Sequence, residues 1–125
     1  METLIIQEDM KTPSITFDPT TGIMEIRGKS IPENSLEFYK PIFGWLDEYC
    51  KQPARKTEMS VILDYFNTSS SKCLLDIFRK LESANSTGSS AVKVRWHYEA
   101  DDEDMMEAGE DYQALVSLPF ELIQI

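Results

Sequence analysis

The clearest change in hydrophobic pattern lies near the middle of the chain. Met59–Leu63 is a short apolar run rich in β-branched residues, which is typical of a buried strand. Beyond it, apolar residues recur at the three- and four-residue spacing of a helix, and they are Cys73, Leu74, Ile77, Phe78 and Leu81. The pattern therefore predicts a strand followed by a helix that runs to about Ser83, with a loop over residues 85–90.

Five small polar residues, Asn67-Thr68-Ser69-Ser70-Ser71, join this predicted strand to the predicted helix. Such side chains accept hydrogen bonds from the free N–H groups of a first helical turn, so one interpretation is that Thr68 or Ser69 is only an N-cap. A helix start at the carboxyl end of a strand also favours an anion. Phosphorylation of Thr68 would bring about −1.5 to −2 charges there. Residue chemistry alone leaves both interpretations open.

Shorter alternating patterns predict the N-terminal part of the sheet. Leu4–Ile6 is a short first strand or a terminal arm, and residues 14–17 and 22–28 form two antiparallel strands around the Asp18–Gly22 turn. Ile15 and Phe17 alternate with polar neighbours, as do Ile23 and, less strictly, Ile26.

A long helix is predicted after Pro32-Glu33-Asn34-Ser35, which has ordinary helix-start chemistry. Its apolar stripe comprises Tyr39, Ile42, Phe43, Leu46, Tyr49 and Cys50. Leu36, Phe38 and Trp45 widen this surface, which favours burial on two sides over an exposed aromatic patch. Because Pro41 removes a backbone donor, we expect the helix to kink, or to begin again, near Tyr39-Lys40.

The C-terminal third predicts a strand, an acidic segment, a helix and a last strand. Ala91–Tyr98 alternates strictly, with Lys93, Arg95 and His97 on a wet face, so helices should cover only one side of the sheet. His97 has no second histidine beside it and is interpreted as an exposed structural residue. The eight carboxylates of Glu99–Asp111 do not match a calcium-loop pattern, so we interpret them as a solvated loop and helix start. Pro119–Ile125 closes the sheet.

The resulting element order is β, β, β, α, β, α, β, α, β. Strand-helix-strand units imply right-handed parallel crossovers, whereas the N-terminal strands pair antiparallel. The predicted fold class is therefore α/β, a mixed sheet with helices mainly on one face. With 125 residues the chain has the length of one domain, predicted as residues 1–125.

Composition narrows the range of functions. A net charge of −10 repels phosphate backbones and anionic membranes, which argues against nucleic-acid or membrane binding. The sequence has neither a signal peptide pattern nor a membrane span, so we expect a cytoplasmic protein. Cys50 and Cys73 lie among apolar helical positions, where we expect reduced thiols. Nucleotide loops, metal clusters and nucleophile elbows are absent from the sequence. We therefore expect no catalytic residue, no cofactor and no metal.

Four blocks of the sequence carry a family resemblance, and they are Pro32–Ser35, Tyr65–Lys72, Asp76–Phe78 and Val94–Glu99. Over nearly the whole chain they resemble the SiaC family of small bacterial regulatory phosphoproteins. The resemblance implies a STAS-like (SpoIIAA-like) fold, as in anti-sigma-factor antagonists, with a phosphorylatable Ser or Thr at a helix start. The family match selects Thr68 for that role, whereas chemistry alone does not separate it from Ser69, Ser70 or Ser71.

The resemblance also implies a partner-switching function. A Ser/Thr kinase would phosphorylate Thr68, a PP2C-type phosphatase would remove the phosphate, and the bare form would bind and activate a diguanylate cyclase. Higher cyclic di-GMP would then favour aggregation or biofilm. We expect the partner to dock on the helix start, which comprises Asn67, Thr68, Ser69, Ser70, Ser71 and Lys72.

Two other functional classes compete with this interpretation. One is a STAS-type antagonist that binds an anti-sigma kinase, for which the partner retained on an affinity column is the test. The other is a small metal-dependent enzyme that uses the acidic segment 99–111, for which calorimetry with magnesium or calcium is the test.

Overall fold

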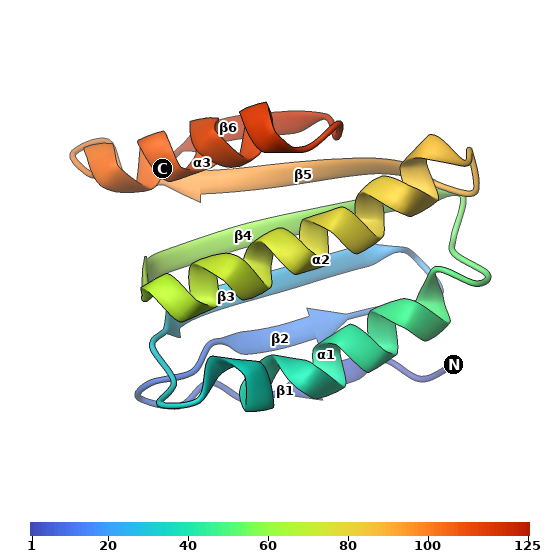
Figure 1. Ribbon diagram of the computed structural model, residues 1–125, viewed down its shortest axis with the longest axis horizontal. Helices are drawn as coiled ribbons and strands as arrows, with labels where there is room; N and C mark the ends of the chain where they lie inside the picture. The colour runs from blue at the N-terminus through green and yellow to red at the C-terminus, as the bar shows by residue number, and fades with distance from the viewer.

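The computed structural model describes residues 1–125 as one six-stranded sheet covered by three helices (Figure 1). In chain order the elements are β1 (Leu4–Ile6), β2 (Ser14–Phe17), β3 (Ile23–Ser30), α1 (Ser35–Tyr49), β4 (Lys56–Phe66), α2 (Thr68–Ser86), β5 (Ala91–Tyr98), α3 (Glu103–Leu115) and β6 (Phe120–Gln124). The strands follow one another across the sheet in the order β1-β2-β3-β4-β5-β6.

The helices share one face because of the strand order. β1, β2 and β3 pair antiparallel, whereas β3, β4, β5 and β6 pair parallel. Each parallel step goes to the next strand in the same direction, so three right-handed crossovers place α1, α2 and α3 on the same side. The other side of the sheet is open. The predicted mixed α/β sheet with helices on one face is confirmed.

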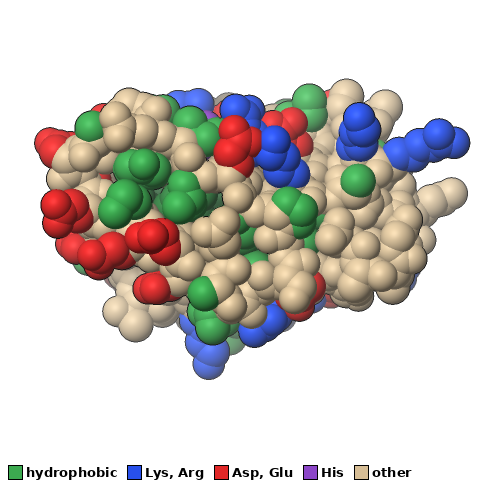
Figure 2. Space-filling model, turned by 90° about the horizontal axis from the view of Figure 1, so that it is seen from above, with side chains coloured by type: hydrophobic (Ala, Val, Ile, Leu, Met, Phe, Trp, Pro, Cys, Tyr) green, Lys and Arg blue, Asp and Glu red, His purple; other side chains and the backbone are tan.

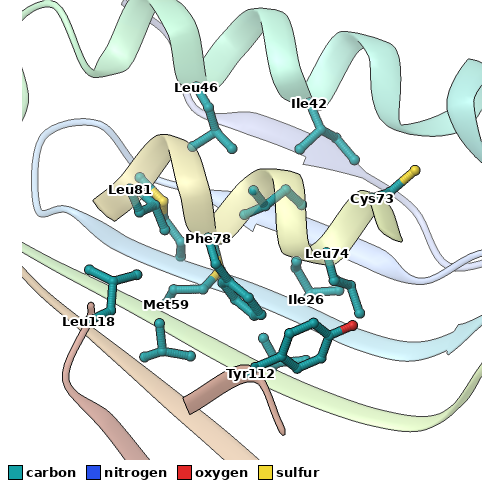
Figure 3. Packing of buried hydrophobic residues seen from close by; sticks show 14 of the residues in the cluster. Ile26, Ile42, Leu46, Met59, Cys73, Leu74, Phe78, Leu81, Tyr112 and Leu118 are labelled. Carbon is teal, nitrogen blue, oxygen red and sulfur yellow. The ribbon is translucent and has the colours of Figure 1, made fainter. Parts of the chain in front are cut away.

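The core lies between the helices and the sheet, with α2 at its centre (Figure 3). Leu74, Phe78 and Leu81 of α2 are fully buried, as predicted from their spacing. α3 approaches the sheet closely at Gly109, where a Cβ atom would lie within 2.5 Å of the Trp96 ring. The Trp96 indole donates a hydrogen bond to the carbonyl of Met105 at 2.9 Å. A glycine at position 109 is therefore what allows α3 to pack on β5.

Several boundaries and orientations differ from the sequence predictions. α2 runs to Ser86 rather than Ser83. Ile23 is 57% exposed and lies on the opposite face of β3 from the buried Met24 and Ile26. Antiparallel pairing with β2 sets Met24 opposite Phe17 and Ile26 opposite Ile15. In β3, Met24 and Ile26 are therefore the core positions.

α1 is a single helix that begins after an Asn34 N-cap and continues through Pro41. Pro41 therefore does not start a new helix, although it removes one backbone hydrogen bond. Phe38 and Trp45 are half-buried, and the Trp45 indole donates to the carbonyl of Glu2 at 2.9 Å. The burial prediction is wrong for Leu36, which is 67% exposed. None of the three helices is long and apolar enough to cross a bilayer.

Candidate functional site

The polar turn between β4 and α2 lies at the carboxyl end of the parallel strands, at the left of Figure 1. Asn67 is its N-cap, and its side-chain oxygen accepts the Ser70 N–H at 2.9 Å. The Asn67 amide group donates to the carbonyl of Pro32 at 3.3 Å, and its backbone N–H donates to the carbonyl of Ser30 at 3.0 Å. The N-cap interpretation of Thr68 or Ser69 is therefore wrong, because the asparagine one position earlier has the capping oxygen.

A chain of buried hydroxyl groups runs beneath this turn. Ser70 is fully buried, and its hydroxyl lies 2.8 Å from that of Ser30 and 3.2 Å from that of Ser35. The Ser30 hydroxyl lies 2.7 Å from the Tyr39 hydroxyl. The Ser35 hydroxyl lies 2.7 Å from that of Ser69, which brings the chain to the surface. β3, α1 and α2 are thus joined at their ends, and Ser70 has no exposed surface with which to touch a partner.

Ser71 is held by the third helix. Its hydroxyl lies 3.0 Å from the Tyr112 hydroxyl, and the Tyr112 O–H donates to the Ser71 carbonyl at 2.7 Å. Figure 3 shows the Tyr112 oxygen at the edge of the buried cluster. α3 therefore braces the first turn of α2 from the side opposite α1.

Thr68 differs from its three serine neighbours. Its side chain is exposed, and its hydroxyl has no hydrogen-bond partner in the chain. As the first two residues of α2, Thr68 and Ser69 also have backbone N–H groups without acceptors. Lys72, one turn further along α2, is exposed and forms no ion pair. The turn thus presents a free hydroxyl, two free N–H groups and a free ammonium group.

The two tyrosines beneath the turn are neutral hydrogen-bonding groups. Burial raises the pKa of Tyr39 to about 12, although its hydrogen bond with Ser30 acts in the opposite direction. Burial likewise raises the pKa of Tyr112 to about 12, against the hydrogen bond with Ser71. Both hydroxyls therefore stay protonated across the physiological range and remain available as donors.

The other candidates from the sequence lie elsewhere. In the acidic segment, Asp102 caps α3 by accepting the Met105 N–H at 3.0 Å, and Glu103 and Asp104 occupy the first turn. No three His, Cys, Asp or Glu side chains are grouped to hold a metal ion. His97 is half-buried on the open face, with its Nδ1 atom 3.3 Å from the Val61 carbonyl oxygen. Cys50 and Cys73 are free thiols, and burial raises the pKa of each.

Comparison with known protein families gives a match over residues 6–125 to the family described as SiaC family regulatory phosphoproteins. The chain belongs to the SiaC family. An uncharacterized protein of Pseudomonas aeruginosa (strain UCBPP-PA14) is 35% identical over 120 residues, which cover 96% of this chain and 94% of that protein.

Solved structures of SiaC itself resemble this SiaC-family chain closely. Apo-SiaC from Pseudomonas aeruginosa is 34% identical, with a TM-score of 0.89 and coverage of 98% of this chain and 99% of that one. A complex of the diguanylate cyclase SiaD with its activator SiaC, also from Pseudomonas aeruginosa, matches with 34% identity, a TM-score of 0.90 and the same coverage. These matches and the family assignment confirm the resemblance to the SiaC family.

The sequence did not reveal the residues that support the turn in this SiaC-family protein. Ser30 ends a strand and Ser35 begins a helix, so nothing local in the sequence distinguishes these two buried residues from surface serines. Tyr39 and Tyr112 fit the apolar stripes of their helices, where a tyrosine looks like any large core residue. Their shared role depends on contacts between residues 9 to 41 positions apart, which no local spacing encodes.

Proposed function

We propose that this protein is a phosphorylation-controlled partner-switching regulator whose bare form binds and activates a diguanylate cyclase. In this proposal a Ser/Thr kinase transfers a phosphoryl group to the Thr68 hydroxyl, and a PP2C-type phosphatase removes it. Cyclic di-GMP would rise when Thr68 is bare. The observation that carries the proposal is the match, over 98% of this chain, to SiaC as the activator in a cyclase complex.

The environment of the four hydroxyl groups supports Thr68 as the modified residue. The Ser70 hydroxyl is fully buried, and the Ser71 hydroxyl is bonded to Tyr112. The Ser69 hydroxyl is exposed but lies 2.7 Å from the Ser35 hydroxyl and 3.2 Å from the Asn67 side-chain oxygen. Only Thr68 combines exposure with a hydroxyl that breaks no internal bond when it is modified.

The same geometry suggests how phosphate would act without refolding the protein. A phosphate on Thr68 would sit at the positive end of the α2 dipole, beside two free N–H groups. Lys72 is four residues further along α2, the spacing at which helical side chains meet. The phosphate would therefore occupy the donors that the bare turn offers to a partner. It would also add negative charge to a chain that is already at −10.

The partner-contacting part of the turn is then smaller than the sequence suggested. Thr68, Ser69 and Lys72 are exposed and Ser71 is half-buried, whereas Asn67 uses its side chain for capping. We therefore assign partner contact to the exposed residues and support of the turn to Asn67 and Ser70. This division separates residues that change binding from residues that change folding.

An affinity column and a cyclase assay test the proposal. The protein with bare Thr68 and the protein with stoichiometric phosphothreonine at position 68 are each immobilised and exposed to extract of the native cells. We expect the bare column to retain a diguanylate cyclase, and the phosphorylated column to retain at least about tenfold less, a difference of about 1.4 kcal/mol in binding. The purified cyclase should then make cyclic di-GMP faster with the bare protein only.

The matched control is Ser83→Ala, which removes an exposed hydroxyl near the other end of α2 and should leave both the modification of Thr68 and cyclase stimulation in place. Equal retention of a cyclase by the bare and phosphorylated columns would contradict the switch. Retention of an anti-sigma kinase instead of a cyclase would favour the STAS-type antagonist.

A further inference from the structure

A cavity lies on the open face of the sheet, at the amino ends of the parallel strands and at the other end of β4 from Thr68. Its volume is about 470 Å³, and its lining is formed by Thr21, Ile23, Lys56, Thr57, Glu58, Ala91, Val92, Lys93 and Pro119. β4 has 11 residues, so its two ends are separated by roughly 30 Å. The cavity is therefore independent of the turn that starts α2.

Strand register explains why this part of the sheet is hollow. Ile23, Glu58 and Lys93 face one another across β3, β4 and β5, and two residues earlier Lys56 faces Ala91. Residues two apart on a strand share a face, so both rows lie on the helix-free side. The short side chain of Ala91 stands between longer ones. The result is a depression with an apolar floor and a charged rim.

The charge at the rim is positive once the ion pairs are considered. Glu58 is paired with Arg95 at 3.0 Å, and Lys93 is paired with Glu121 at 2.6 Å. Lys56 forms no ion pair, which leaves one free cation at the rim. Figure 2 shows the same polarity, with acidic side chains gathered at the left end and Lys and Arg side chains protruding at the right.

Buried hydrogen bonds and a close backbone contact fix the wall of the cavity. Thr57 lines it, and the Thr57 hydroxyl lies 2.7 Å from both the Tyr49 hydroxyl and the Ser90 hydroxyl. Gly22, at φ +76°, lets the start of β3 approach the Lys56 carbonyl, because a Cβ there would lie 2.0 Å from that oxygen. The cavity is thus formed before any ligand arrives, which reduces the entropy lost on binding.

We propose that this cavity binds a small organic anion with an apolar body, its carboxylate or phosphate head paired with Lys56 and its body lying against Ile23, Ala91 and Pro119. The volume falls within the range of ordinary ligand pockets, roughly 300–1,000 Å³. The lining combines apolar side chains with the charged Lys56, Glu58 and Lys93. Binding is independent of the phosphorylation state of Thr68, so this inference stands or falls separately from the proposed switch.

An NMR titration of the full chain tests the proposal. Hexanoate and hexyl phosphate are the probes, and hexanamide is the neutral control with the same apolar body. We expect saturable amide shifts at residues 21–23, 56–58 and 91–93, with residues 68–72 unmoved. Affinity should lie in the millimolar range and fall at least about tenfold for hexanamide, as expected when an ion pair worth about 1.4 kcal/mol is lost. The tighter of the two anions identifies the preferred head group.

Two variants make the test specific. Lys56→Gln should lower the affinity for the anions about tenfold and abolish their advantage over hexanamide. Lys72→Gln is the matched control, because Lys72 is also exposed and unpaired but lies at the other end of the molecule. Both substitutions are on the surface, so both variants should fold. The proposal would be overturned by unchanged binding in Lys56→Gln or by equal shifts with hexanamide. It would also be overturned if the shifts spread over all lysines, or if no shift saturated.

Discussion

The two ends of the sheet are each held by buried hydroxyl groups, and α1 contributes one tyrosine to each end. At the amino ends, Thr57 stands between Tyr49 and Ser90, with hydroxyl separations of 2.7 Å on both sides. All three residues are at most 2% exposed. This chain of hydroxyls is closed, because both of its ends lie inside the protein.

At the carboxyl ends the corresponding chain is longer and open. It runs from Tyr39 through Ser30, Ser70 and Ser35 to Ser69, whose side chain is exposed. Thr68 precedes Ser69 in the sequence, and its hydroxyl takes no part in this series of hydrogen bonds. The internal hydrogen bonds fix the turn, and the Thr68 hydroxyl, which we propose is phosphorylated, is left outside them.

Alkaline pH should have the largest effect on the hydroxyl network at the carboxyl ends of the strands. The folded-state pKa of Tyr39 and of Tyr112 is raised from 10.0 to about 12. A raised pKa stabilises the folded state fully below pH 10, and this contribution is lost as pH increases from 10 to 12. Each shift corresponds to about 2.7 kcal/mol, so the free energy of unfolding should fall by about 5 kcal/mol in that window. Urea unfolding measured at a series of pH values checks this.

Tyr39→Phe serves as the control for the alkaline transition. It loses the hydrogen bond with Ser30, so its stability should be lower at neutral pH. Because it has no phenolic proton to lose, its stability should decline less steeply between pH 10 and 12. A slope equal to that of the parent protein would show that Tyr39 ionises freely, and that the hydroxyl beneath the turn is not sealed from water.

Two substitutions with smaller expected effects, one in each hydroxyl chain, compare the two chains directly. Thr57→Val keeps the shape of the side chain but removes the central hydroxyl at the amino end, so Tyr49 and Ser90 lose their shared partner. We expect a loss of about 2–3 kcal/mol. Ser70→Ala should cost only about 1–2 kcal/mol, because its neighbours Ser30 and Ser35 keep their bonds to Tyr39 and Ser69. Chemical denaturation of both variants gives the comparison.

Amide hydrogen exchange adds a local measurement to these two variants. Ser70→Ala should speed exchange in the first turn of α2, where the Ser70 N–H is bound to the Asn67 side chain. Thr57→Val should leave that turn protected to the same degree, once its lower global stability is taken into account. If both variants loosened the turn equally, the two networks would be one cooperative unit rather than two.

The sequence predicted the fold well because its signals were local. The helical spacing of Leu74, Phe78 and Leu81 and the strict alternation of Ala91–Tyr98 each arise within one element. The one-sided arrangement of helices then follows from the right-handed crossover rule. The exposure of Ile23 is also local, because Ile23 shares a face of β3 with Glu25 and Arg27, whereas Ile26, three residues later, lies on the other face.

The sequence predicted where the polar turn lies but not which side chains support it. A run of small polar residues between a strand and a helix is a visible signal, and the structure places the start of α2 within it. The sequence could not distinguish the four hydroxyls, since their difference lies in contacts made by Ser30, Ser35 and Tyr112. The cavity near Lys56 was missed entirely, because its lining comes from several segments whose register only the sheet defines.

The smallest expected effect on stability is at Thr68, the residue that we propose is phosphorylated. Thr68→Ala removes a hydroxyl that is exposed and has no hydrogen-bond partner, and alanine is the better helix former. Its unfolding free energy should therefore stay within about 0.5 kcal/mol of the parent value. Asn67→Ala, one position earlier, should lose about 1–2 kcal/mol because it removes the cap. Thermal and urea unfolding of both variants measures the contrast. A loss above about 1 kcal/mol in Thr68→Ala would show that this hydroxyl holds the turn together, and the separation between supporting and modifiable groups would then fail at its central residue.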